Sequence, residues 1–315
     1  MKMKIAGLLL YCGIVLLNLI SCVSSEAQVG VFSKSEILEY TTLYSGERFS
    51  DGRPKVSDEI LDRLENIAIE EAWSVLKNNG YNNQFEGDFT NTNENPKLVG
   101  RAVTTYYLPL RPDVNDINNT KGDLYGNSGG RPKHWLMNSL NKGDVLVADV
   151  YGKKIEVAFV GSRLANSVYE KTGKGIVVDG GCRDLDGIRE IANFPVFCRG
   201  WSPTSSKDIM LMGINTPIRI GNAVVMPGDV VMGRSEGVIF IPAHLALEVV
   251  ETAEIIGYRD EFSFIRLREE TYTPGQIDDK WSAEIEKDFR EWLLKEKGKT
   301  LTPKHEEYLL KGQTW

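Results

Sequence analysis

The segment that most constrains the fold runs from Gly161 to Gly187, where a short helix leads directly into a buried strand. Ser162 is the candidate N-cap of this helix, and Gly173 ends it. The apolar run Ile176 to Val178 predicts a buried strand, followed by a turn at Asp179 to Gly181. Such a pattern indicates an α/β fold, in which ligands gather at the carboxyl ends of the strands.

The same segment carries two features that suit a small anionic substrate. The first backbone amides of a helix have no partner inside it, and the helix dipole adds positive charge there. The amides in question lie in the stretch Gly161, Ser162, Arg163 and Leu164. Arg183 and Asp184 follow the strand, so a guanidinium that can bind a carboxylate stands beside a carboxylate that can bind a hard cation. A surface ion pair explains Arg183 and Asp184 equally well from these residues alone.

Four motifs in a fixed order extend the pattern. They are GDVLVADVYG (143–152), GSRLANSVYEKTGKGIVVDGGCRDLDGI (161–188), FPVFCRG (194–200) and AVVMPGDVVMGRSEGVIFIP (223–242). As an ordered set they resemble the RraA-like family, which includes the 4-hydroxy-4-methyl-2-oxoglutarate / 4-carboxy-4-hydroxy-2-oxoadipate aldolases and the regulator of ribonuclease E activity. The resemblance covers roughly residues 56–256 and is strongest from 143 to 242.

The resemblance implies an α/β fold, a three-layer β/β/α sandwich of the swivelling-domain type. It also implies a homotrimer or hexamer with sites between subunits. A helix from Val56 to Asn79, capped by Ser57, would cover the sheet and help to build the oligomer. Residues 257–315 lie outside the resemblance and are expected to form a helical extension. The apolar face of a helix within Asp279 to Lys297 would pack on its own domain or on a neighbouring subunit.

The resemblance also implies roles for the site residues. The backbone amides from Gly161 to Leu164 would hold the substrate carboxylate. Arg183 would contact the keto oxygen or the carboxylate and stabilise an enolate, and Asp184 would bind Mg²⁺ or Mn²⁺, largely through water. These are the two expected catalytic residues, and Asp184 is the expected metal ligand.

One position departs from the family pattern. The aldolases usually carry an acid three residues after the Asp of the Arg-Asp pair, where this chain has Gly187. Asp186 could substitute for that acid or simply cap the following helix. Other candidate carboxylates are Asp149, Asp179, Glu236 and Asp229, or an acid of a neighbouring subunit. Asp229, in Pro-Gly-Asp, is better explained as a turn former.

The N-terminus has the pattern of a targeting segment. Lys2 and Lys4 precede an apolar run from Ile5 to Ile20, and Leu19 to Cys22 matches a bacterial lipobox. Residues 1–21 are therefore expected to be a signal peptide, with Cys22 lipidated and residues 22–55 forming an N-terminal arm. The protein would then be an exported periplasmic or outer-membrane lipoprotein that touches the membrane only through its lipid anchor. Cleavage after Ala27 is the alternative.

Composition limits the possible partners and ligands. The net charge is −7 and no basic block is present, which argues against nucleic acid as a partner. The three histidines are widely spaced, which argues against a histidine-rich zinc site. Cys182 and Cys198 are expected to be small buried thiols, and whether they form a disulfide stays open. Residues 28–55 and the segments 82–95 and 111–132 are expected to be an extended arm and two polar loops.

Three functional interpretations follow. The first is a divalent-metal-dependent lyase or aldolase that acts on a small 2-oxo acid or sugar-derived acid. The second is a non-catalytic binding or regulatory protein at the cell envelope, and the third is a lipoprotein that captures a solute without chemistry. Export would separate the protein from ribonuclease E, and a purely protein-binding role needs no anion-binding turn beside Arg183 and Asp184. We therefore favour the lyase.

Overall fold

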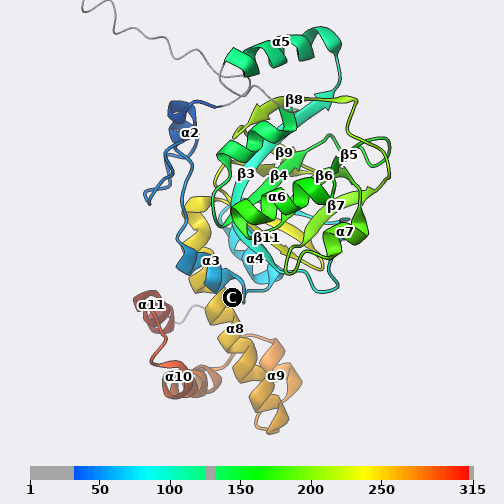
Figure 1. The fold of residues 1–315 in the computed structure, drawn as a ribbon. Helices are drawn as coiled ribbons and strands as arrows, with labels where there is room; N and C mark the ends of the chain where they lie inside the picture. Colours follow the sequence, from blue (N-terminus) through cyan, green and yellow to red (C-terminus); the bar gives the residue numbers. More distant parts are fainter. Residues whose placement is uncertain (1–31, 125–131, 312–315) are drawn as a thin grey trace, which may run out of the picture.

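The computed structural model describes residues 32–124 and 132–311, so the expected signal peptide and Cys22 lie outside the described residues. A mixed sheet dominates the fold, with strand order β1-β12-β11-β3-β4-β6-β7-β2, and with β5 beside β6 and β8 beside β3 (Figure 1). The four strands β3, β4, β6 and β7 run parallel, and β5 runs parallel to β6. None of the described helices is long and apolar enough to cross a membrane.

The strands of this sheet vary widely in length. They are β1 (Phe85–Glu86), β2 (Thr90–Asn91), β3 (Leu98–Pro109), β4 (Asp144–Asp149), β5 (Ala158–Val160), β6 (Ile176–Cys182), β7 (Val196–Trp201), β8 (Ile209–Ile214), β11 (Val230–Arg234) and β12 (Gly237–Ile241). A separate hairpin consists of β9 (Ile218–Ile220) and β10 (Ala223–Val225). The helical segments are α2 (Lys34–Tyr40), α3 (Asp58–Leu64), α4 (Ile69–Asn78), α5 (Pro112–Leu124), η1 (Pro132–Ser139), α6 (Ser162–Thr172), α7 (Leu185–Arg189), η2 (Ala243–Leu245), α8 (Ala246–Arg268), α9 (Pro274–Asp278), α10 (Ala283–Lys297) and α11 (Pro303–Lys311).

The two faces of the sheet are covered by different layers. Strand β3 shows the alternation, because Val99 and Val103 belong to the cores under the helices while Leu98 and Ala102 belong to the core under the β9–β10 hairpin. Helix α6 covers one part of the helical face, and α3, α4 and α8 cover the part formed by β11 and β12. The expected α/β fold with β/β/α layers is confirmed.

The prediction of a single helix from Val56 to Asn79 is wrong. The segment forms α3 and α4 with a break between Glu65 and Ala68. The guanidinium of Arg234 occupies this break and donates from Nη2 to the carbonyl oxygens of Leu64, Glu65 and Ile67, at 2.9, 3.2 and 3.2 Å. Carbonyls at a helix end need such partners, so a residue on β11 fixes the break.

Two segments that were expected to be extended or looped contain helices. Within the arm, Ser33 and Glu36 form a capping box that starts α2, with the Ser33 amide donating to Glu36 at 2.7 Å. Within the segment 111–132, α5 forms and its Asn118 side chain donates to the carbonyl of Leu211 at 3.0 Å. Strand β8, which contains Leu211, was also missed.

The turn predicted at Asp179 to Gly181 is wrong as well, because β6 continues to Cys182. A Cβ atom at Gly181 would lie 2.4 Å from the carbonyl oxygen of Val157 and 2.5 Å from that of Lys154. The glycine therefore permits a close backbone approach inside the sheet rather than a change of direction.

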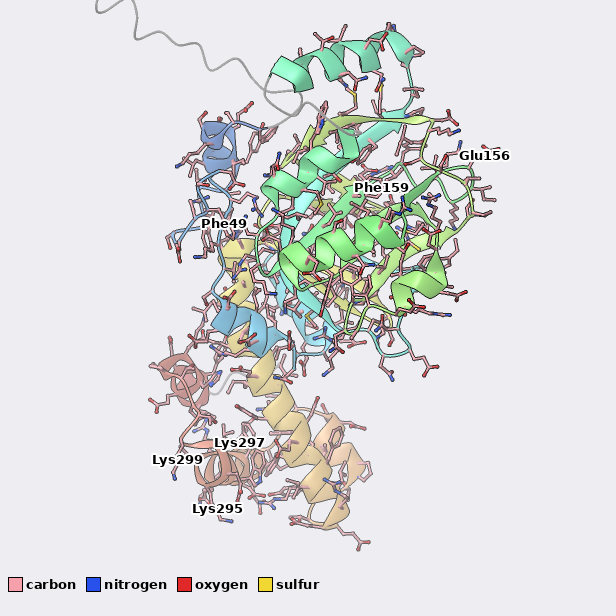
Figure 2. The ribbon with its side chains drawn as sticks, viewed as in Figure 1. Phe49, Glu156, Phe159, Lys295, Lys297 and Lys299 are labelled. Carbon is pink, nitrogen blue, oxygen red and sulfur yellow. The ribbon has the colours of Figure 1, made fainter. Side chains whose placement is uncertain are left out.

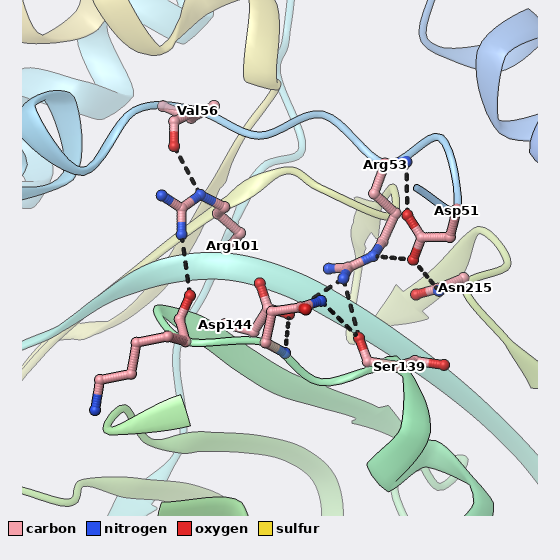
Figure 3. A network of polar contacts seen from close by, with 9 residues as sticks. Asp51, Arg53, Val56, Arg101, Ser139, Asp144 and Asn215 are labelled. Carbon is pink, nitrogen blue, oxygen red and sulfur yellow. Dashed lines mark hydrogen bonds and ion pairs between the residues drawn. The ribbon is translucent and has the colours of Figure 1, made fainter. Parts of the chain in front are cut away.

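Figure 3 shows how the arm is fixed to the amino ends of β3 and β4. Arg53 is fully buried and donates to Asp51 at 2.8 Å, to the Ser139 carbonyl at 3.0 Å and to Asp144 at 3.2 Å. Arg101 donates to the carbonyl of Val56 at 2.6 Å. Burial raises the pKa of Asp144, and the charge of Arg53 opposes that rise.

The residues beyond the expected family region form a second small core. Side chains of α8, α10 and the intervening segment pack together, and its buried members are Ile255, Phe262, Trp281, Ile285, Phe289, Trp292 and Leu293. The predicted apolar face of α10 thus packs on its own chain. Figure 2 shows Lys295, Lys297 and Lys299 around α10, apart from Phe159, which lies inside the main domain.

Helix α11 is held to α3 and α8 by an ionic cluster. Nε2 of His305, a fully buried side chain, lies 3.0 Å from Glu254. Arg63 binds the same carboxylate with two bonds of 2.8 and 2.7 Å. Burial alone would raise the pKa of Glu254, but its contacts with Arg63 and His305 hold it at about 2.

The buried pair of Arg53 and Asp144 yields a stability prediction. Replacing one partner leaves the other charge buried and unpaired, which costs about 3–5 kcal/mol. We expect Arg53→Met to lower the free energy of unfolding by that amount in urea titrations. Lys55→Met, which removes a solvent-exposed ion pair with Glu47, is the control and should cost less than about 1 kcal/mol. Equal losses in the two variants would contradict the assignment.

Asp229 yields a prediction on pH. Its carboxylate accepts the Met226 amide at 2.8 Å, as expected of a turn former, and burial raises its pKa to about 7. The folded protein therefore keeps a proton that the unfolded chain, with an ordinary Asp pKa of about 3.9, releases. The contribution of Asp229 to stability should be full below about pH 4 and should fall as the pH rises to about 7.

The variant Asp229→Asn tests this, because Asn retains an acceptor for the Met226 amide and does not titrate. The difference in unfolding free energy between wild type and variant, measured in urea from pH 4 to 8, should decline up to about pH 7 and then level off. A difference that is constant over this range would show that Asp229 does not hold its proton in the folded state.

Candidate functional site

The expected site residues meet where β5, β6 and α6 join. The Arg183 amide donates to the carbonyl of Val160 at 2.8 Å, which places the residues after β6 beside the turn into α6. Gly161 is needed there, because a Cβ atom would lie 2.7 Å from Oδ2 of Asp184 and 2.9 Å from Nε of Arg183. The structure thus brings the Arg-Asp pair and the first turn of α6 together.

Asp184 sits in the left-handed region, with φ of 59° and ψ of 42°, at the N-cap position of α7. Its Oδ2 accepts the Ser162 amide at 3.2 Å and the Ser162 hydroxyl at 3.3 Å. Arg183 Nε lies 3.7 Å from the same oxygen, and the two side chains of the pair are 41% and 42% exposed. The pair is therefore an ordered but accessible arrangement of opposite charges.

The expectation that Ser162 caps α6 is wrong. Gly161 occupies the N-cap position and has no side chain to offer, and Ser162 is the first helical residue. The carboxylate of Asp184 supplies the cap from outside the helix. Arg163 is exposed on the first turn, whereas the Leu164 side chain is buried in the core, so Leu164 offers only its backbone amide to a ligand.

The other candidate carboxylates serve different contacts. Asp179 accepts Arg199 at 2.7 Å and the Gly221 amide at 3.2 Å, and Asp149 accepts the Tyr151 amide at 2.9 Å. Their bonds fix loops and the β9–β10 turn. Glu236 is exposed between β11 and β12, and Asp186 is exposed in the first turn of α7.

Arg199, whose side chain is 8% exposed, was not singled out by the sequence analysis. Besides Asp179 it donates to Glu86 at 2.8 Å, and its guanidinium lies 4.1 Å from the centre of the Phe89 ring. Glu86 in turn accepts the Asn222 amide at 3.1 Å. Because these partners are distant in sequence, no local pattern reveals the cluster.

The end of β7 borders the site, and the sequence analysis did not predict it. Trp201 pairs with Cys182, and the Ser202 amide donates to the Cys182 carbonyl at 2.8 Å. Trp201 is half-buried and packs against the core beneath α6. Trp201 and Ser202 therefore lie on the strand beside β6, at the point where the chain continues into Arg183.

Cys182 and Cys198 are free, buried thiols, as the default expectation held. Burial raises the pKa of Cys182, and the hydrogen bond between the two thiols lowers the pKa of Cys198. In the sheet register Cys198 pairs with Val178 and Cys182 with Trp201, so the two cysteines are neighbours through their side chains without being paired residues.

A magnesium or manganese ion would rely on few protein ligands here. Across residues 32–124 and 132–311, no three His, Cys, Asp or Glu side chains gather as a metal-binding group. Magnesium keeps several waters and needs only one or two carboxylates. Asp184 fits such an ion, since its carboxylate is 42% exposed and only Oδ2 is bound by Ser162.

Comparison with known sequences points to one family. The model of the RraA-like family (Aldolase/RraA) matches residues 54–240. A putative 4-hydroxy-4-methyl-2-oxoglutarate aldolase of Halalkalibacterium halodurans is 34% identical over 118 residues, which cover 38% of this chain and 55% of that protein. An uncharacterised protein of Methanocaldococcus jannaschii is 33% identical over 119 residues, which cover 38% and 57%. The chain thus spans little more than half the length of these relatives.

Comparison with solved structures supports the fold. The Streptomyces coelicolor protein RraAS2, described as an unusual member of the RNase ES inhibitor RraA family, has a TM-score of 0.56 and 26% identity, covering 68% of this chain and 98% of that one. An uncharacterised protein of Pseudomonas syringae has a TM-score of 0.59 and 21% identity, covering 75% and 98%. Because the family model also matches more than half of the sequence, this chain belongs to the RraA-like family.

Proposed function

We propose that this protein is a divalent-metal-dependent lyase that cleaves or decarboxylates a small 2-oxo acid or a sugar-derived acid through a stabilised enolate. The observation that carries the proposal is the placement of Arg183 and Asp184 against the first turn of α6. Relatives named as putative aldolases of a 2-oxo acid support a lyase of this general type.

Each part of the site has a distinct task in this proposal. The amides of Arg163 and Leu164, at the positive end of α6, would bind the substrate carboxylate. The guanidinium of Arg183 would donate to the oxygen that becomes negative when the C–C bond breaks. Asp184 would hold Mg²⁺ or Mn²⁺, partly through water, and the ion would act as a Lewis acid on the keto group.

The exposure of the pair bears on assembly. With both side chains about two-fifths exposed, the site of a single chain is open to water. A homotrimer or hexamer in which a neighbouring subunit covers this edge would shield it and could contribute a further carboxylate. Shielding strengthens electrostatic contacts in the transition state, because water no longer screens them.

One observation favours a second function, a non-catalytic binding or regulatory protein at the cell envelope. Gly187 stands where the aldolases usually carry an acid, and in the described part of the chain Asp184 belongs to no group of three metal-binding side chains. Such a protein would bind a small anion at the same site without turning it over.

The first test of the lyase is decarboxylation of oxaloacetate, which also passes through an enolate. We expect turnover that requires Mg²⁺ or Mn²⁺ and that falls about 10²–10³-fold in Arg183→Ala, the usual cost of losing one donor to a developing oxyanion. Asp184→Ala should lose the metal-dependent turnover, because it removes the proposed metal ligand. Lys171→Ala, at an exposed position in the last turn of α6, is the control and should retain full activity.

The outcome also separates the two functions. Metal-independent turnover, or turnover that survives in Arg183→Ala, would contradict the lyase. Binding of oxaloacetate without turnover in the folded protein, lost in Arg183→Ala, would support the binding protein instead.

We further propose that the protein is exported and anchored through a lipid on Cys22, on the basis of the lipobox at Leu19 to Cys22. Expression in a bacterial host should yield a protein that partitions into detergent and carries an acyl mass. Cys22→Ala should abolish both properties. A soluble wild-type product that begins at Gln28 would instead indicate cleavage after Ala27.

A further inference from the structure

Ser162 binds Asp184 through two hydrogen bonds. Its backbone amide and its hydroxyl both donate to the same oxygen, Oδ2 of Asp184, at 3.2 and 3.3 Å. The two residues are far apart in sequence but adjacent in space because β5 and β6 pair in parallel. One carboxylate oxygen is thereby fixed, and Oδ1 is the oxygen left for a cation.

Two glycines leave the space that this contact needs. Besides Gly161, whose Cβ would crowd Asp184, Gly187 lies on the other side of the contact. A Cβ atom at Gly187 would lie 3.2 Å from Cβ of Ser162 and 3.6 Å from its hydroxyl oxygen, closer than ordinary contacts allow for the carbon pair. A side chain at Gly187 would therefore press on Ser162, which would have to shift by a few tenths of an ångström.

We infer that Ser162 is a positioning residue that orients the Asp184 carboxylate, and that it is not a contact of the substrate. This inference rests on the proposed function of the site. With the Ser162 amide occupied by Asp184, the substrate carboxylate is left with the next amides of the turn, those of Arg163 and Leu164.

The physical effect of Ser162 is on the orientation of its neighbour. A carboxylate on a half-exposed side chain samples several rotamers, and two hydrogen bonds to one oxygen restrict it to one. Groups that orient a metal ligand in this way typically change metal affinity by 10–100-fold when they are removed. Loss of the hydroxyl alone, with the amide kept, should lie at the low end of that range.

The test is the affinity of the full-length protein for Mn²⁺, measured by electron paramagnetic resonance of the free ion. We expect Ser162→Ala to weaken Mn²⁺ binding about 10-fold. Gly187→Ala should weaken it as well, because its methyl group presses on Cβ of Ser162 without removing a polar atom. Ser167→Ala is the matched control, since Ser167 lies on the same helix and its hydroxyl donates to the Arg163 carbonyl at 2.9 Å.

Unchanged Mn²⁺ affinity in Ser162→Ala, together with lost binding in Asp184→Ala, would overturn the inference while leaving the proposed function intact. Steady-state kinetics at saturating Mn²⁺ further separate a positioning role from a substrate contact. A positioning role predicts that saturating Mn²⁺ restores most of the oxaloacetate turnover of Ser162→Ala with the substrate KM unchanged. A raised KM at saturating Mn²⁺ would show that Ser162 contacts the substrate instead.

A second measurement tests the contact between Ser162 and Asp184 even if the protein binds no metal. If Asp184 caps α6 through Ser162, Asp184→Ala must expose the Ser162 amide, and its hydrogen exchange in metal-free protein should accelerate at least 10-fold by NMR. Exchange that is unaffected by Asp184→Ala would refute the contact itself. Accelerated exchange in a protein without Mn²⁺ affinity or turnover would retain the contact and reject the proposed function and the positioning role with it.

Discussion

The parallel pairing of β6 with its neighbours is the constraint on which the rest of the structure depends. β6 pairs with β4, β5 and β7, so its residues are buried along its whole length. The chain leaves the sheet only where β6 ends, at the side formed by the carboxyl ends of the parallel strands. That is where Arg183 and Asp184 lie. Gly161 leaves room for their side chains, and Gly181 leaves room for the backbone of Val157.

Local patterns were sufficient for the parts of the fold that are stabilised locally. The apolar run of β6 and the glycine stop of α6 predicted a strand and a helix at the right place, and the ordered motifs predicted the layers. The break between α3 and α4 could not be foreseen, because Arg234 binds its carbonyl oxygens from another part of the chain. Helix α5, which meets β8 through Asn118, has the same kind of distant support.

The same limit applies within the site. Sequence placed Arg183 and Asp184 after the strand and named Gly161 and Ser162 at the start of the helix. Capping rules consider residues adjacent in sequence, so they assigned the cap to Ser162. In the structure the cap is a carboxylate 22 residues further along, brought there by strand pairing. Chemistry-bearing residues were thus predictable by type, whereas their pairing depended on the tertiary fold.

Helix α8 links the two cores of the chain. Its first turns contribute Val249 and Val250 to the main domain, and the part from Ile255 to Phe262 contributes to the aromatic core of the extension. A protease that degrades the chain from its carboxyl end would first release α11 and α10 and so expose the face of α8 around Phe262. Because α8 belongs to both cores, loss of α10 and α11 would leave its carboxyl-terminal part without apolar partners while its amino-terminal part stays packed in the main domain.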